Sequence, residues 1–325
     1  DLKTEAYISI TYKKELVYYL KDSKEGNILS LDVDIEEGID PLVAIQMVTI
    51  NCAQCFQMDH ELGSITPGKC ADIVFIDDLN KINITKVIID GNVVAENGVL
   101  TTEIAEYHYP EDAMNSMHIK EEITPKSFDI LAEGKDKVNA RVIEIIPARV
   151  GTYERHIELE VKDGKVQCDV SKDVLKAAVF ERHHETGKVG YGFVKGFGIK
   201  GGAMAATVAH DAHNLLVVGT NDEDMALAAN TLVECGGGMV AVKDGKVLGL
   251  VPLPIAGLMS DRPLAEMAEK VEGLDKAWKE IGCDIVSPFM TMALIPLACL
   301  PELRLTNRGL VDCTKFELVP LFVEE

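Results

Sequence analysis

The sequence of 325 residues contains no apolar run long enough to cross a membrane. Its longest such run, residues 290–300, is shorter than the roughly 20 residues that a transmembrane helix needs, and Pro296 interrupts it. The first twenty residues also lack the cationic segment and following apolar segment of a secretory signal peptide. We therefore expect a soluble, cytoplasmic protein with no membrane partner.

Basic residues are outnumbered: 32 Lys and Arg face 53 Asp and Glu, which gives a formal net charge of −21 at pH 7. The chain also lacks a basic stripe with interleaved aromatic side chains. Because a phosphate backbone and an anionic membrane surface both repel such a charge, the composition argues against nucleic acid and lipid partners.

The eight cysteines lack the regular close spacing of a disulfide framework or a zinc site. Only Cys52 and Cys55 are near each other, and no second such pair exists. They lie in the apolar segment 42–56, for which we predict a helix. We therefore interpret this pair as helix packing and all eight residues as reduced thiols.

Length and composition allow two or three domains with a sizeable core, since 47% of the residues are apolar and 26% are charged. In the N-terminal part, Asp40-Pro41 is a typical helix start, and Asp90-Gly91 is a favoured hairpin turn. The expected elements are a strand at 8–12, a helical turn or two at 14–20, a helix from 41 to about 56, a strand at 71–76 and a hairpin of 86–89 with 92–95. Residues 100–127 are polar and predict a connector, in which His108 and His118 are expected to be exposed.

A new α/β pattern begins near Phe128. The string VKDGKV occurs at 161–166 and again at 242–247, so two hairpins are expected, either from a duplicated unit or from turn chemistry alone. The other expected elements are a strand at 142–146, a short helix at 172–180 capped by Ser171, a strand at 215–218 ending at Gly219, a helix capped by Asn221, and a core-packing amphipathic helix from Pro263 to Gly282.

The stretch 183–222 concentrates unusual residues: eight of its forty residues are Gly, and it holds four of the eight histidines. Dense glycine indicates backbone that passes close to something, and imidazoles beside it suggest a polar pocket. A glycine-rich phosphate cradle at 187–202 is an alternative, but no Gly-Lys-Ser/Thr follows. Close packing of backbone segments explains these glycines better.

The sharpest cluster is His210-Asp211-Ala212-His213-Asn214, directly before the predicted buried strand. His210 and His213 could share one face of a helical turn, with Asp211 fixing a tautomer or joining a metal. Three interpretations stay open: side chains that hydrogen-bond nearby backbone and hold a loop, the lining of a substrate pocket, and metal ligation. The string has no identifiable third ligand, which makes the metal signal weak.

Two sets of motifs resemble known families. The order GIDPLVAIQMVTIN, GSITPGKCADIVFID and VIIDGNVVAENG resembles the end of an amidohydrolase-superfamily enzyme, in which the last helix of a metal-dependent (β/α)8 barrel leads into a β-sandwich. The long segments from ERHHETGKVGYGF to IAGLMSD and from SPFMTMALIP to NRGLVD are similar to the C-terminal domain of the adenine deaminase family. Together the resemblance covers about residues 38–322.

This resemblance implies hydrolytic deamination of adenine to hypoxanthine and ammonia at a divalent metal, Mn or Fe, in the barrel. The family's ligands begin with a His-x-His pair, and this chain contains none. The nearest acidic candidates for the last barrel strand are Asp32 and Asp34. The other zinc deaminase pattern, His-x-Glu with Pro-Cys-x-x-Cys, is also absent. We therefore expect the barrel to be mostly missing and this polypeptide to be inactive alone.

The sequence thus predicts an α+β protein: a small amidohydrolase-type β-sandwich module plus a larger C-terminal α/β domain of mixed sheet and packed helices. The expected parts are 1–60, the barrel end with its last helix; 61–125, the sandwich and connector; and 126–325, the adenine-deaminase-type domain. Adenine is the expected small-molecule substrate. The chain is also expected to form a homo-oligomer or to bind a partner chain that carries the barrel. The alternative is a non-catalytic purine-binding or oligomerisation module.

Local chemistry selects six substrate-pocket candidates within the central stretch, and the resemblance assigns none of them a role. Glu181 and Arg182, which precede them, are expected to be a surface pair. The candidates are His183, His184, His210, Asp211, His213 and Asn214.

Overall fold

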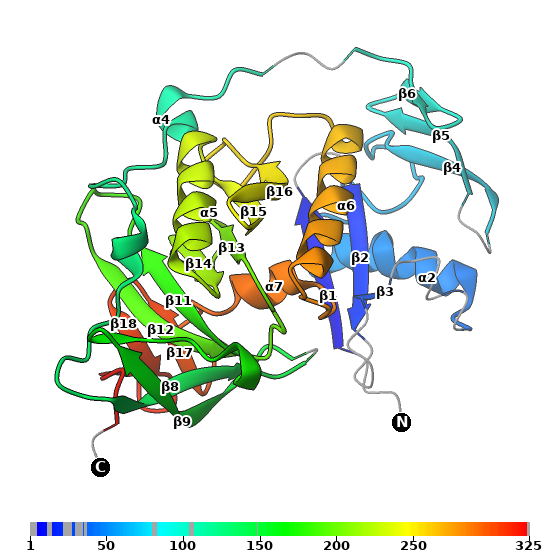
Figure 1. Ribbon diagram of the computed structural model, residues 1–325. Helices are drawn as coiled ribbons and strands as arrows, with labels where there is room; N and C mark the ends of the chain where they lie inside the picture. Colours follow the sequence, from blue (N-terminus) through cyan, green and yellow to red (C-terminus); the bar gives the residue numbers. More distant parts are fainter. Residues whose placement is uncertain are drawn as a thin grey trace. The chain divides into compact units, whose positions relative to one another are not determined.

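The computed structural model describes residues 5–11, 15–21, 28–29, 35, 38–79, 83–103, 107–147 and 149–323 (Figure 1). The chain forms two compact units, Asp1–Tyr107 and His108–Glu325. Both contain helices and sheets, and the described residues form no closed barrel. No helix among them has the length and apolar character needed to cross a membrane.

The first unit begins with an antiparallel sheet of β1 (Glu5–Thr11), β2 (Glu15–Lys21) and β3 (Ile28–Leu29). The strand expected at 8–12 is therefore confirmed. The helical turn expected at 14–20 is wrong, since β2 pairs with β1 over seven residues. The segment ELVYYLK is rich in residues that favour strands, and this propensity outweighs its weak helical period.

The predicted Asp40 cap is confirmed: its carboxylate accepts from the N–H of Leu42 at 2.9 Å and begins α2 (Pro41–Val48). The single helix expected up to residue 56 is instead divided at Thr49, and α3 (Ile50–Cys55) follows. Cys52 is buried in α3, with its Sγ 3.0 Å from the Met47 carbonyl oxygen, whereas Cys55 is exposed. Neither forms a disulfide, and the predicted helix packing holds for Cys52 but not for the exposed Cys55.

A second sheet of this unit has the order β4 (Ile73–Asp78), β5 (Asn83–Ile89), β6 (Asn92–Glu96) and β7 (Val99–Leu100). The predicted Asp90-Gly91 hairpin joins β5 to β6, and both turn residues have positive φ, as this turn requires. None of the described residues in these four strands is buried. The two sheets of this unit agree with a β-rich module, and their pairing into a sandwich stays a prediction.

The second unit contains a nine-stranded sheet in which only β8 and β12 run parallel. Its spatial order is β10, β9, β8, β12, β11, β14, β13, β15, β16. The strands are β8 (Lys137–Ile145), β9 (Thr152–Lys162), β10 (Lys165–Val166), β11 (Val174–Phe180), β12 (Val189–Lys195), β13 (Ala203–Ala206), β14 (Leu215–Gly219), β15 (Gly238–Lys243) and β16 (Lys246–Pro252).

The helix predicted at 172–180 is wrong, because these residues form β11, a central strand. All seven residues of β11 are buried, Lys176 included, and a run that is buried on both faces shows neither the helical nor the alternating period. Ser171 caps nothing; it lies in a 3-10 turn, η2 (Val170–Lys172), where the Asp169 carboxylate accepts from its N–H at 3.1 Å.

Alternate residues of the strands face two separate cores. Leu215 and Val217 pack with α5 (Asp222–Glu234), whereas Leu216 and Val218 pack with α6 (Leu264–Glu280), so the sheet lies between these helices (Figure 1). The predicted Asn221 cap is confirmed by its side chain, which accepts from the Asp224 N–H at 2.8 Å. The α6 side of the sheet also carries α7 (Pro288–Ala293) and a small sheet of β17 (Leu303–Thr306), β18 (Gly309–Asp312) and β19 (Glu317–Val319).

The amphipathic character of α6 is confirmed in its C-terminal half, and in its N-terminal half Met267 packs against the same core while partly buried. Leu274, Ala277 and Trp278 are buried against β16, but Leu264 is 71% exposed and Val271 is also exposed. The apolar face of α6 therefore continues beyond the part of the helix that packs on the sheet.

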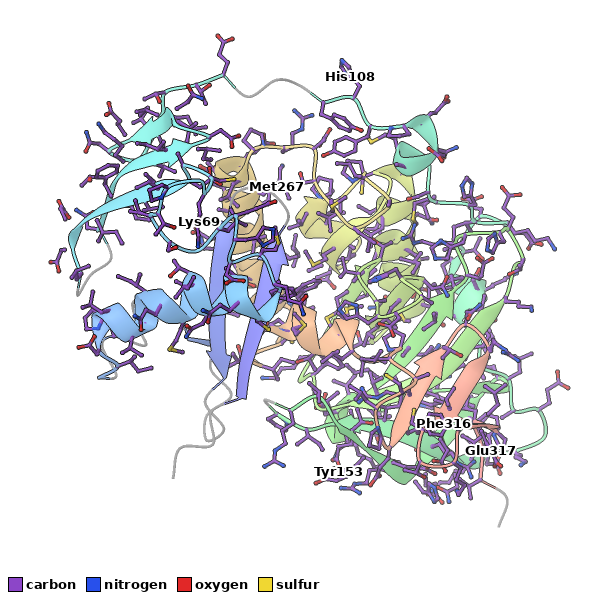
Figure 2. The ribbon with its side chains drawn as sticks, turned by 180° about the vertical axis from the view of Figure 1, so that it is seen from behind. Lys69, His108, Tyr153, Met267, Phe316 and Glu317 are labelled. Carbon is purple, nitrogen blue, oxygen red and sulfur yellow. The ribbon has the colours of Figure 1, made fainter. Side chains whose placement is uncertain are left out.

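The connector prediction needs correction in its second half, which packs on the second unit. After α4 (Glu111–Met114), Ile123 is buried against the α5 core, and η1 (Pro125–Phe128) follows. His108 is exposed, as expected, and Figure 2 shows it extending away from the ribbon. His118 is half-buried instead, and its N–H donates to the carbonyl of Arg182 at 2.8 Å.

The two VKDGKV strings form hairpins at opposite edges of the large sheet, β9–β10 and β15–β16. They are held differently: the Asp224 carboxylate of α5 accepts from the Gly245 N–H at 2.8 Å, whereas the Gly164 carbonyl accepts from the Ala132 N–H. The different surroundings favour turn chemistry over a duplicated unit.

Glycines at the centre of the second unit allow close packing of backbone. A Cβ at Gly190 of β12 would lie 1.8 Å from the carbonyl oxygen of Thr306. No such contact exists at Gly273, in the middle of α6, where a Cβ would meet no atom within 4 Å.

We expect Gly190→Ala to destabilise the protein by about 1–3 kcal/mol or more, because β17 must move away from β12. Gly273→Ala should instead stabilise it by about 1 kcal/mol, because alanine favours the helix. Urea denaturation of both variants measures these changes. Equal free energies of unfolding for the Gly190→Ala variant and the original protein would contradict the packing.

Candidate functional site

Several loops of the second unit connect the strands at one end of the large sheet, where the strands begin or finish. Neighbouring strands run antiparallel there, so the ends of β11, β13 and β16 lie beside the starts of β14 and β15. The loops at this end are 181–188, 207–214 and 253–262, and we call them the loop edge. All six predicted site residues lie on it.

The structure brings four histidines of the loop edge into two pairs. The rings of His210 and His213 have centroids 5.1 Å apart and meet edge to face, and those of His183 and His184 are 6.2 Å apart. His183 joins the two loops, since its Nε2 lies 2.7 Å from the Ala212 carbonyl oxygen. The sequence cluster is thus also a spatial cluster.

The burial of the six candidates separates them into groups. His183, His210 and His213 are half-buried, whereas His184 and Asp211 are exposed. Asn214 is buried, and its Oδ1 accepts from the backbone N–H of Arg182 at 3.3 Å. Asn214 therefore holds one loop against another, and its amide oxygen is already used.

His213 sits in a tight turn that fixes its ring. Its N–H donates to the Ala209 carbonyl at 2.8 Å, and the Ala209 N–H lies 3.3 Å from its Nδ1. Burial lowers the pKa of His213, as do His210 and Arg182; Asp211 acts in the opposite direction, and His183 adds to the lowering. A neutral ring that accepts at Nδ1 carries its proton on Nε2.

Arg182 is not a surface residue, and the predicted surface pair is wrong. Its side chain is 1% exposed, and burial lowers its pKa to about 10. Nε donates to the His213 carbonyl at 2.6 Å, Nη1 to the Ser116 carbonyl at 2.7 Å, and Nη2 to the Ala256 carbonyl at 2.9 Å. One guanidinium therefore ties the connector to two loops.

Glu181 is buried as well, and its carboxylate holds the β11–β12 loop. It accepts from the N–H groups of His183 and His184 at 2.6 and 2.9 Å and from the Thr186 hydroxyl at 2.8 Å. Burial alone would raise the pKa of Glu181, but the bonds from Thr186 and from the two histidine N–H groups together lower it to about 2.

Two adjacent charged residues usually indicate a surface, which is why sequence reasoning missed both side chains. Glu and Arg are seldom buried without partners, and the partners of both side chains are mostly backbone groups, so the sequence carried no signal for their burial.

The described residues do not provide a metal site. They include no group of three or more His, Cys, Asp or Glu side chains arranged to hold an ion. Asp32 and Asp34 lie outside the described residues. The metal interpretation of the histidine cluster therefore has no geometric support, and we derive no chemistry through a metal here.

The phosphate-cradle alternative also lacks support. The N–H groups of Gly196 and Gly198, which such a cradle would need, each donate to the Asp173 carboxylate at 2.9 Å. Gly190 and Gly192 lie within β12. The glycines thus serve backbone packing and an internal carboxylate.

Comparison with known families gives two matches. The family model described as adenine deaminase C-terminal domain matches residues 149–317, just over half of the chain. The chain belongs to the adenine deaminase C-terminal domain family. A second model, the amidohydrolase family, matches residues 15–94. Both predicted resemblances are confirmed.

Curated relatives of this adenine deaminase domain agree with that assignment. An adenine deaminase of Clostridium botulinum (strain Langeland) is 85% identical over 306 residues, which are 94% of this chain and 51% of the relative. Those of Moorella thermoacetica and Desulforamulus reducens are 56% and 40% identical, over 88% and 100% of this chain and 48% and 55% of their own length. The chain spans about half the length of the curated relatives it matches.

The Glu181 carboxylate should make stability depend on pH. Because folding lowers its pKa from 4.5 to about 2, its stabilising contribution is present above pH 4.5 and is lost as the pH falls toward 2. We expect Glu181→Gln to lower the free energy of unfolding by roughly 1–3 kcal/mol at pH 7.

The same variant should lose less stability than the original protein between pH 4.5 and 2, as measured by urea denaturation at each pH. Glu185→Gln, in the same loop but exposed, is the matched control. Parallel curves for the original protein and Glu181→Gln would show that this carboxylate is not the cause.

Proposed function

We propose that this chain is the C-terminal portion of an adenine deaminase and that it acts in the hydrolysis of adenine to hypoxanthine and ammonia. The observation that carries the proposal is membership of the family combined with a span of about half the length of its relatives. In this proposal the chain contributes to the reaction together with the part of its relatives' length that it does not span.

The metal that the reaction requires also supports a role for a further part of the enzyme. A divalent ion activates water for attack on the ring carbon in such enzymes, and Mn or Fe is the expected ion. This sequence has no His-x-His pair, and the part of the chain that the structure describes has no group able to hold an ion. We expect the ligands to lie in the part of the relatives that this chain does not span, on the same polypeptide or on a partner chain.

The apolar surface of the first unit gives independent support. All residues of α2 except Gln46 are apolar, yet Leu42 is 62% exposed, Val43 is exposed, and only Ala44 is buried. A helix that is apolar all round belongs inside a larger core. The sheet of β4 to β7 also exposes apolar side chains, among them Val74 and Phe75, which a further part of the protein would bury. In this proposal, the part of the relatives that this chain does not span covers these exposed apolar side chains.

The loop edge is the part of this chain that we assign to substrate. Five of the six candidates, all except Asn214, are exposed or half-buried there. Imidazole and carboxylate groups supply both hydrogen-bond donors and acceptors, which suits a purine edge. In this role the second unit covers adenine, and the reaction belongs to adenine catabolism and purine salvage in the cytoplasm.

We expect the 325-residue chain alone to release no ammonia from adenine, with Mn(II) or Fe(II) present. Adding the missing half of the Clostridium botulinum relative should restore ammonia release, measured by a coupled glutamate dehydrogenase assay. The botulinum half without this chain is the control. Robust turnover by this chain alone would refute the proposal, and adenine binding without ammonia from the assembled halves would favour the non-catalytic module.

We expect Leu42→Glu to leave the stability of the isolated chain nearly unchanged, because the side chain is exposed, and to weaken its association with the missing half. Leu131→Glu, at a similarly exposed position of the second unit, should leave this association intact. Analytical ultracentrifugation of the mixed halves measures both. Equal association of the two variants would show that α2 is not covered.

A further inference from the structure

We propose that Arg182 is a positioning residue for His213: it fixes the turn 209–213 so that His213 presents its Nε2–H donor to a neutral ring acceptor, such as a purine nitrogen. The inference rests on the proposed function, because it assigns a ligand chemistry to the same loop edge. Arg182 itself is buried and touches no ligand in this scheme.

The first step is the clamp that Arg182 forms. Its three guanidinium nitrogens donate to carbonyls of Ser116, His213 and Ala256, which are 66, 31 and 74 residues away in the sequence. Its backbone takes part as well, because its N–H donates to the Asn214 side chain and its carbonyl accepts from the His118 N–H. The turn that carries His213 is thus held from both ends.

The clamp requires an arginine. A planar guanidinium directs several N–H groups in fixed directions, whereas a lysine ammonium is a single point on a flexible stem. The surroundings are shaped to this fork: a Cβ at Gly257, whose φ is +71°, would lie 2.8 Å from Nη2 of Arg182. Thr207 fixes that neighbouring loop, since its hydroxyl donates to the Gly257 carbonyl at 2.6 Å.

The second step is the proton position on His213. The Ala209 N–H lies against Nδ1, which is therefore the acceptor, and the proton of a neutral ring is on Nε2. No hydrogen bond within the described residues uses Nε2, and the His213 side chain is half-buried, so we infer that this N–H is free to donate to a ligand. The charged or titratable groups that face His213 are Arg182, His210, Asp211 and His183, and all except Asp211 disfavour a second proton.

The third step concerns the ligand. A protonated imidazole attracts phosphate, whereas a neutral imidazole with an N–H donor pairs with an uncharged acceptor. The net charge of −21 adds repulsion toward an anion. The arrangement therefore fits a free nucleobase better than a nucleotide.

The test is nitrogen NMR of histidine-labelled chain, which reports tautomer and pKa directly. We expect His213 to be the Nε2–H tautomer with a pKa below its ordinary value. Arg182→Lys keeps the charge but cannot reach three carbonyls, so it should mix the tautomers and raise the pKa of His213.

The matched control is Arg304→Lys. Arg304 is equally buried and also donates to carbonyls, those of Leu294 and Leu300, but none lies in the loop edge. The Arg304→Lys variant should be less stable than the original protein, and its His213 signals should be unchanged. Unchanged signals in Arg182→Lys, or the same change in Arg304→Lys, would overturn the positioning role.

A second pair covers the case in which Arg182→Lys does not fold. In Gly257→Ala the added methyl group would displace the guanidinium of Arg182. Gly245→Ala is the control, because Gly245 has the same φ of +71°, but a Cβ there would meet no atom within 4 Å. Only the first should change the tautomer of His213. An unchanged tautomer in Gly257→Ala argues against the clamp.

The class of ligand is tested separately, by nitrogen NMR of the labelled chain mixed with the other half of the enzyme. Adenine should shift the Nε2 signal of His213, and adenosine 5′-phosphate should shift it at least tenfold more weakly at equal concentration. An equal shift, or none with adenine, overturns the ligand assignment. Loss of ammonia release with these NMR results intact would instead reject the proposed function alone.

Discussion

The loop edge of the second unit depends on the buried guanidinium of Arg182, which makes hydrogen bonds to carbonyls and no ion pair among the residues that the structure describes. Removing a guanidinium from water is unfavourable, and the three carbonyls and one serine hydroxyl around Arg182 offset that cost only when all of them are in place. The loops of this edge therefore share one hydrogen-bonding partner, and losing one contact leaves part of the guanidinium unsatisfied. Glu181 does the same for the neighbouring loop with the opposite charge, by collecting N–H groups.

Local chemistry was enough to predict the turns and caps. The Asp-Gly hairpins, the Asp40 and Asn221 caps and the strand after Asn214 all depend on residues close in sequence, and all are found. The strand β11 could not be identified this way, because burial on both faces leaves no period to detect. A strand and a buried helix differ there only in their distant neighbours.

The site shows the same limit. The histidines were found because their clustering is visible in the sequence, but the residue that organises them was not. The partners of Arg182 are backbone carbonyls up to 74 residues away, and any residue type supplies such a carbonyl. Interactions of a side chain with backbone leave no pairing signature in a single sequence, whereas an ion pair needs an opposite charge as its partner.

The repeated VKDGKV hairpins also determine how the large sheet ends. Each places a lysine on both sides of its turn, Lys162 with Lys165 at one margin and Lys243 with Lys246 at the other. Charged lysines at the outermost strands oppose the addition of further strands, and β10 is only two residues long. Fibre-like stacking of copies is thereby discouraged at both margins, which leaves helices and loops as the surfaces through which this domain can join other chains.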